Sequence, residues 1–377
     1  MTDTHAMLAE PTHDELAEQM FVRDLKVHMF RTVDPLAGKL AEVMDPGEHS
    51  NSRVETTYEA LSKKPGFARF VGLYRGSQEL LWSLVGHSVD RQARRLEEIA
   101  SNAPQDLGSL TLDPEMEQPE YIAEGDIHMM PGGYALDDGS LVQGALMDRG
   151  GAVYMLGQNG GFLNDRRGWT LAAHLNSRWP DLKPEKILEM GCGIGASIVP
   201  LAKTYPDAEV HGIDVGASML RYALARARHL GAAVHFRQAS AEATSYPDES
   251  FDVIFSCAMF HETSPDAMSN IMDECFRLLR PGGIVAHLEV PQRYEDEALW
   301  TQVRGELERV YNNEPNWKTA ISANYQTLLK VAGFEDVAIG YQDATGSADS
   351  TPDNFSDTNK GVFQSWFVAS GVKPPKN

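Results

Sequence analysis

The feature that most constrains this chain is a glycine-rich turn after a short apolar run. Residues 188–195 read LEMGCGIG, so three alternate glycines stand directly before a helical pattern. Glycine suits a sharp strand-to-helix turn because it adopts positive φ and lets a ligand approach the backbone. The turn therefore predicts an α/β sheet with a ligand site at the carboxyl ends of its strands.

Two acidic residues narrow the kind of ligand. Asp214 ends the next predicted strand, where a carboxylate can accept hydrogen bonds from ribose hydroxyls. The spacing G-x-G-x-G differs from the G-x-G-x-x-G that places a pyrophosphate at a helix N-terminus. With Glu189 just before the turn, this spacing favours a ligand that carries an ammonium group and no phosphate. A nicotinamide oxidoreductase and a purely structural turn are the alternatives.

From about residue 183 onward, predicted strands alternate with helices, which is typical of parallel α/β proteins. No helix is expected between the last two strands, so the sheet should end in an antiparallel pair. The predicted strands are 186–190, 209–214, 234–238, 252–256, 283–289, 337–341 and 364–370, and the predicted helices are 197–203, 217–230, 267–279, 294–311 and 322–332.

The first half of the chain has a different pattern. Apolar residues recur at helical spacing over 14–44 and 77–100. Glycine pairs punctuate 121–161 and predict small hairpins or ordered loops, and a further helix is expected at 166–178. We therefore expect three regions: a helical domain at 1–115, a glycine-rich linker or lid with hairpins at 116–180, and the ligand-binding α/β domain at 181–377.

Four segments in order resemble the successive motifs of class I S-adenosylmethionine-dependent methyltransferases. They are LEMGCGIG, HGIDVGASML, PDESFDVIFSCAMFHE and LLRPGGIVAHLEV. The resemblance spans about residues 184–370 and implies a Rossmann-like sheet of seven strands, here preceded by a mainly helical domain. It also implies S-adenosylmethionine as the cofactor and a small-molecule acceptor, by analogy with two-domain O-methyltransferases.

The resemblance assigns a cofactor contact to individual residues. The turn and Glu189 would line the methionine moiety, Asp214 the ribose, and Met219 the adenine ring. Ser240 stands where the family usually has an Asp facing the adenine amino group, so the backbone of Ala241 is an alternative contact. The full expected set is Glu189, Gly191, Gly193, Asp214, Met219, Ser240, Ala241 and Ser256, with Ser256 beside the sulfonium, and Tyr154 and Asn159 from the lid.

Methyl transfer from a sulfonium is an in-line displacement, in which the protein mainly aligns the two partners. A base helps when the acceptor arrives protonated. His261 and Glu262, which follow the fourth predicted strand, are the candidate catalytic residues. The alternative for His261 is a cap or loop-ordering role. We expect an oxygen acceptor; nitrogen, carbon or sulfur acceptors and a non-methylating cofactor-binding protein stay open.

Composition excludes several other classes. The formal net charge of −21 opposes binding to a phosphate backbone, so no nucleic-acid partner is expected. Three cysteines without paired spacing argue against disulfides and zinc, and we predict no metal site. No signal peptide or membrane-length apolar run is present. We expect a soluble cytoplasmic protein without a membrane partner, with the helical domain forming a homodimer or a wall of the substrate pocket.

Overall fold

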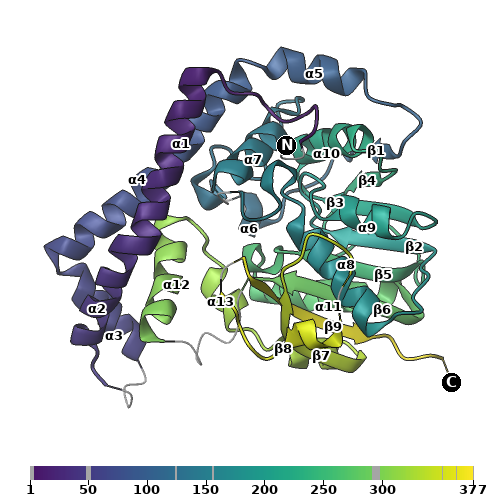
Figure 1. The fold of residues 1–377 in the computed structure, drawn as a ribbon. Coiled ribbons are helices and arrows are strands. Elements are labelled where there is room, and N and C mark those ends of the chain that lie inside the picture. Colours follow the sequence, from purple (N-terminus) through teal and green to yellow (C-terminus); the bar gives the residue numbers. More distant parts are fainter. Residues whose placement is uncertain are drawn as a thin grey trace.

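The computed structural model describes residues 4–47, 52–123, 125–154, 157–290, 298–349, 351–361 and 363–376. One sheet runs through the second half of the chain, in the order β1-β4-β3-β2-β5-β6-β9-β7-β8 (Figure 1). The strands are β1 (Ser109–Thr111), β2 (Lys186–Met190), β3 (Glu209–Asp214), β4 (His235–Gln238), β5 (Phe251–Cys257), β6 (Leu279–Glu289), β7 (Glu335–Asp343), β8 (Phe355–Ser356) and β9 (Ser365–Val372).

The expected seven-stranded α/β sheet is confirmed. Strands β4, β3, β2, β5 and β6 are parallel, and β9 lies antiparallel to both β6 and β7. Two short edge strands, β1 and β8, extend it to nine. Strand β1 comes from the region at 1–115, expected to be a helical domain, and it pairs in parallel with β4. A strand of three residues is too short to show the alternation that predicts strands.

Helices cover both faces of the sheet and form most of the first half of the chain (Figure 1). The helix expected at 77–100 is two helices, which meet at Arg91 and Gln92, and the predicted start of the helix at 294 lies outside the described residues. The helices are α1 (His13–His28), α2 (Asp34–Met44), α3 (Arg53–Ser62), α4 (Pro65–Asp90), α5 (Ala93–Ser101), α6 (Glu120–Ala123), α7 (Val142–Tyr154), α8 (Arg166–Arg178), α9 (Ile198–Thr204), α10 (Ala217–His229), α11 (Pro265–Leu278), α12 (Leu299–Tyr311), α13 (Trp317–Ile321) and α14 (Tyr325–Val331).

The expectation of hairpins at 116–180 is wrong. The described part of this segment is helical or irregular and contains no strand. Its glycine pair at 150–151 lies inside α7, where it allows close packing: a Cβ on Gly150 would lie 2.0 Å from Cζ3 of Trp82 in α4. Gly150, one of the glycines that suggested turns, therefore serves a helix–helix contact.

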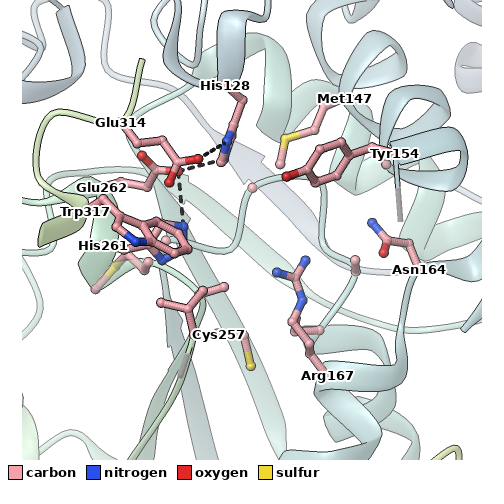
Figure 2. Close-up of a pocket in the computed structure, with 18 of the residues that line it drawn as sticks. His128, Met147, Tyr154, Asn164, Arg167, Cys257, His261, Glu262, Glu314 and Trp317 are labelled. Carbon is pink, nitrogen blue, oxygen red and sulfur yellow. Dashed lines mark ion pairs between the residues drawn. The ribbon is translucent and has the colours of Figure 1, made fainter. Parts of the chain in front are cut away.

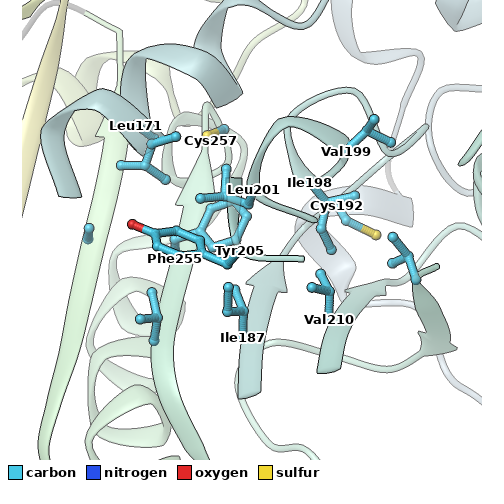
Figure 3. Close-up of a cluster of buried hydrophobic side chains, with 14 of the residues drawn as sticks. Leu171, Ile187, Cys192, Ile198, Val199, Leu201, Tyr205, Val210, Phe255 and Cys257 are labelled. Carbon is cyan, nitrogen blue, oxygen red and sulfur yellow. The ribbon is translucent and has the colours of Figure 1, made fainter. Parts of the chain in front are cut away.

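A tightly packed cluster of apolar side chains joins the central strands to helices α8 and α9. Figure 3 shows Ile187, Val210 and Phe255 of the strands against Leu171 of α8 and Leu201 of α9. All five side chains are buried. This packing gives the carboxyl ends of β2, β3 and β5 a rigid base.

Helix α12 follows the sheet strand β6 in sequence but packs against the N-terminal helices. Its Val303 and Leu307 share a buried cluster with Phe67 and Phe70 of α4. The Tyr74 hydroxyl of α4 donates a 2.6 Å hydrogen bond to Oε1 of Glu308. This contact joins regions that the sequence assigns to different domains; the boundaries at 115 and 180 stay predictions.

No helix in the described part of the chain is long and apolar enough to cross a membrane. The three cysteines are buried and carry no disulfide.

The contact between α7 and α4 can be tested with a matched pair of glycines. We expect Gly150→Ala to lower the free energy of unfolding by about 1–3 kcal/mol, because the new Cβ overlaps the buried Trp82 ring. Gly86→Ala in α4, whose Cβ would meet no atom within 4 Å, should raise it by about 0.5–1 kcal/mol. Urea unfolding of both variants measures the difference, and equal shifts would contradict the packing argument.

Candidate active site

A cavity of about 960 Å³ lies at the carboxyl ends of the central strands. Glu189, Asp214 and Cys257 line it from the sheet, and segments of the first half line the opposite side. Its volume is at the upper end of the range for small-molecule and cofactor sites. The sheet therefore provides a site where parallel α/β folds bind their ligands.

The glycine-rich turn is held against the end of β3. Gly191, Gly193 and Gly195 have φ values of +67°, +50° and +73°, a region that favours glycine. The Gly193 amide donates a 2.8 Å hydrogen bond to Oδ2 of Asp214, and Gly216 donates another to Oδ1. Burial raises the pKa of the Asp214 carboxyl, and the amide hydrogen bonds oppose that shift. The remaining lone pairs of both oxygens are available to hydroxyl donors.

Glu189 and Arg167 offer opposite charges to the same cavity. Glu189 is buried, its Oε2 has no hydrogen-bond partner among the described residues, and burial raises the pKa of its carboxyl well above the usual value. Arg167, from the first turn of α8, lines the same cavity, and Figure 2 shows its guanidinium pointing into it. An amino-acid group could pair its ammonium with Glu189 and its carboxylate with Arg167. Nothing in the local sequence distinguishes Arg167 from Arg166 beside it.

Eight of the predicted site residues reach this cavity. They are Glu189, Gly191, Gly193, Asp214, Ala241, Tyr154, His261 and Glu262. Tyr154 extends from α7 toward the cavity, as the lid hypothesis expects, although it does so from a helix (Figure 2).

Met219 and Ser240 do not line the cavity. Met219 is fully buried in the cluster between α10, α7 and α4, because its position in α10 faces that packing. Val215, directly after Asp214, lines the cavity instead. The hydroxyl of Ser240 accepts a hydrogen bond from the Glu242 amide, while its neighbours on both sides contribute to the lining.

Ser256 and Asn159 are also directed away from the cavity. The Ser256 hydroxyl is 2.9 Å from Nδ1 of His287, and the next residue, Cys257, lines the cavity because neighbouring strand residues face opposite sides. Asn159 is buried and donates a 2.6 Å hydrogen bond to Oδ1 of Asn164, which is itself a lining residue. Asn159 therefore supports the cavity wall from behind.

The wall opposite Arg167 carries a group of paired charges, which we call the acid–imidazole cluster: His128, His261, Glu262 and Glu314 (Figure 2). Nε2 of His128 lies 2.9 Å from Oε1 of Glu262, and Nδ1 lies 2.9 Å from Oε1 of Glu314. Nε2 of His261 lies 3.4 Å from the same Glu262 oxygen. The sequence did not single out His128 or Glu314, since neither lies in a motif.

The charges around His261 are unsuited to the base role considered from the sequence. Burial alone lowers the pKa of His261, but the carboxylates of Glu289 and Glu262 outweigh it and raise the pKa to about 10. Burial raises the pKa of Glu262, but His128 and His261 outweigh it and hold the pKa well below its usual value. In this arrangement His261 keeps its proton at neutral pH, and Glu262 is a weak base.

An unusual backbone turn aims His128 at the cluster. His128 and Met129 have φ values of +57° and +58°, which side-chain-bearing residues seldom adopt. The His128 carbonyl accepts a 2.7 Å hydrogen bond from Nε1 of Trp82 and a 2.9 Å bond from Nε2 of Gln78. Two side chains of α4 thus hold a strained turn in place, as happens at functional sites.

Residues 187–283 match a family model described as a methyltransferase domain. This part of the chain forms a methyltransferase domain, as the resemblance of its four motifs implies. The matched range runs from β2 into β6 and includes the glycine-rich turn, Asp214 and His261. S-adenosylmethionine is accordingly the cofactor, and the site residues are assigned to its binding.

Several curated relatives share this region. A phosphoethanolamine N-methyltransferase of Triticum aestivum is 34% identical over 168 residues, which are 42% of this chain and 29% of that protein. A fatty-acid O-methyltransferase of Mycolicibacterium smegmatis is 29% identical over 122 residues, 32% of this chain and 43% of that protein. The chain spans less than half the length of these relatives.

Among solved structures, one similar chain is phosphoethanolamine N-methyltransferase 2 of Haemonchus contortus in complex with S-adenosyl-L-methionine. It has a TM-score of 0.44 and 18% identity, and the alignment covers 60% of this chain and 57% of that chain.

The ribose assignment of Asp214 predicts a specific loss of affinity. Asp214→Ala should weaken binding of S-adenosylhomocysteine by about 1–3 kcal/mol, because hydroxyl–carboxylate hydrogen bonds are charge-assisted. Isothermal titration measures the affinity, and the exposed Asp207→Ala serves as the control. Unchanged affinity in a folded Asp214→Ala variant would refute the assignment.

Proposed function

We propose that this protein transfers a methyl group from S-adenosylmethionine to an oxygen atom of a small-molecule acceptor. The observation that carries the proposal is the continuity of the cavity. The cofactor-type residues at the strand ends and the acid–imidazole cluster line the same cavity. A methyl donor and an acceptor bound there would meet without a channel between separate sites.

The cofactor is assigned to the side of the glycine-rich turn. Glu189 binds the ammonium group, Arg167 the carboxylate and Asp214 the ribose hydroxyls. Val215, directly after Asp214, borders the adenine. The sulfonium then faces away from the sheet toward the acid–imidazole cluster, which leaves the remaining volume for the acceptor.

The acceptor region supplies hydrogen-bond donors. His128 and His261 carry protons, and both side chains face the cavity. Arg23, Arg31 and Arg304 also line the cavity, and two of them are paired: Arg23 with Asp24 and Arg304 with Asp34. These donors and positive charges suit an oxygen nucleophile that arrives ionised, such as a carboxylate or an acidic phenol, which needs no base for transfer.

An amine nitrogen is the second candidate acceptor, and a specific observation favours it. Glu262 and Glu314 present two buried carboxylates to the cavity, which would pair with an ammonium group. The relatives are also divided, since their names include phosphoethanolamine N-methyltransferases and a fatty-acid O-methyltransferase. A cytoplasmic location and a homodimer through the helical domain stay predictions from the sequence.

The proposal is tested with methyl-labelled S-adenosylmethionine and panels of small carboxylic acids, phenols and amines. We expect labelled methyl esters or ethers, identified by mass spectrometry, and no product from the Asp214→Ala variant at low cofactor concentration. Labelled amines alone would replace the oxygen proposal with the nitrogen one. Cofactor binding with no labelled product from any panel would contradict methyl transfer to small molecules.

Tyr134 provides a test confined to the acceptor side. Its hydroxyl donates a 3.3 Å hydrogen bond to Oε1 of Glu262 and its ring lines the cavity. Tyr134→Phe should lower kcat by about tenfold, the rate equivalent of about 1.4 kcal/mol, and leave cofactor affinity unchanged. Tyr58→Phe, in α3 and outside the cavity lining, should change neither value. A loss of cofactor affinity in Tyr134→Phe would place this residue on the other side of the site.

A further inference from the structure

We propose that His128, His261 and Glu262 form a binding site for one divalent transition-metal ion, with Glu314 and Glu289 orienting the two imidazoles. The sequence predicts no metal site, because its three cysteines have no paired spacing, and His128 lies far from His261 and Glu262 along the chain. The fold brings them together at the wall of the cavity (Figure 2).

The donor atoms have the separations that a small coordination sphere needs. Nε2 of His128 and Nε2 of His261 lie 2.9 and 3.4 Å from the same Glu262 oxygen. Ligands bound to a metal at about 2.0–2.2 Å are themselves about 3 Å apart. The ligand atoms of the whole acid–imidazole cluster lie within 4.8 Å of one another, so a modest adjustment would place an ion between them.

Both histidines have a carboxylate behind them. Nδ1 of His261 lies 3.0 Å from Oε2 of Glu289, and Nδ1 of His128 lies 2.9 Å from Oε1 of Glu314. In each ring this leaves Nε2 directed at Glu262. A histidine that ligates a metal characteristically donates its other ring N–H to a carboxylate, which fixes the tautomer and the ring orientation. Both His128 and His261 show this arrangement, and Nε2 of each ring faces the carboxylate of Glu262.

Two buried carboxylate oxygens of the cluster lack a partner that a metal ion could provide. Oε2 of Glu262 and Oε2 of Glu314 are buried and have no hydrogen-bond partner among the described residues. The Glu314 side chain is only 1% exposed. Buried charges in proteins are paired or coordinate a metal. A divalent cation that displaces the Nε2 protons of His128 and His261 would take over from them as the positive partner of Glu262.

The ligand types indicate the class of metal. Two imidazoles and one carboxylate suit Mn²⁺, Fe²⁺, Co²⁺ or Zn²⁺, whereas Mg²⁺ and Ca²⁺ prefer oxygen ligands alone. Three protein ligands leave open positions, and these would face the cavity. A metal there would hold the acceptor oxygen beside the methyl donor; this use rests on the proposed function, whereas metal binding itself does not.

Cobalt(II) provides a direct probe of the site. The untagged full chain, stripped with a chelator, is titrated with Co²⁺ while visible absorption and metal content are measured. We expect one equivalent of tightly bound metal and absorption bands typical of mixed nitrogen–oxygen coordination. His128→Gln and His261→Gln should each weaken binding at least 100-fold, and Glu289→Gln should weaken it about 10–100-fold through the orientation of His261.

The matched control is Glu306→Gln. Glu306 is a buried glutamate of α12 that pairs with Arg309 and Lys318 outside the cavity lining, so its variant should bind Co²⁺ as the unmodified protein does. Thermal unfolding and S-adenosylhomocysteine affinity are measured on each sample. A protein that binds S-adenosylhomocysteine but takes up no equivalent of Co²⁺, Mn²⁺, Fe²⁺ or Zn²⁺ overturns the metal site and leaves the proposed function standing. Co²⁺ binding that is unchanged in His128→Gln and Glu289→Gln would also overturn it.

Discussion

The carboxylate of Glu289 fixes the loop after β5 that carries His261, and the geometry of the acid–imidazole cluster depends on that loop. Glu289 stands at the end of β6 and is fully buried. Its Oε1 accepts hydrogen bonds from the amides of Met259 and Phe260, at 2.7 and 2.6 Å, and its Oε2 lies 3.0 Å from Nδ1 of His261. One side chain thus fixes the loop after β5 and the orientation of its histidine. A charged acceptor of this kind is costly to bury unless its hydrogen bonds are satisfied, so the loop and the strand end stabilise each other.

The first half of the chain completes the site through α4. Trp82 fits against Gly150 of α7 and also donates to the carbonyl of His128. The same aromatic side chain therefore links the packing of the lid region to the position of a charged group in the cavity. Helix α4 also packs against α12, and its Trp82 shares a buried cluster with Ile194 of the glycine-rich turn, so a change in the N-terminal helices would reach both sides of the site.

Prediction from the sequence succeeded for the elements and residues that a local sequence pattern determines. The strand–helix alternation gave all seven principal strands, and the turn, Glu189 and Asp214 lie where the motif implies. It failed where packing decides the direction of a side chain. Met219 and Val215 are both apolar and both follow Asp214, and only the orientation of α10 separates a core residue from a lining one. His128 and Glu314 meet across a long stretch of sequence, so no local spacing could pair them.

The state of the acid–imidazole cluster and the kind of acceptor are linked by charge. Methyl transfer removes the positive charge from the sulfonium, and a negatively charged wall opposes this loss unless positive charge appears on the acceptor. Carboxylates without a compensating cation therefore favour an amine, which becomes more positively charged as it is methylated. Protonated imidazoles or a bound divalent ion neutralise the wall and favour an anionic oxygen, whose charge cancels that of the sulfonium. In a cavity of low polarity, such differences in charge change the free energy of the transition state more than they would in water. The choice between oxygen and nitrogen is thus determined by what balances Glu262 and Glu314, more than by the cofactor half of the site.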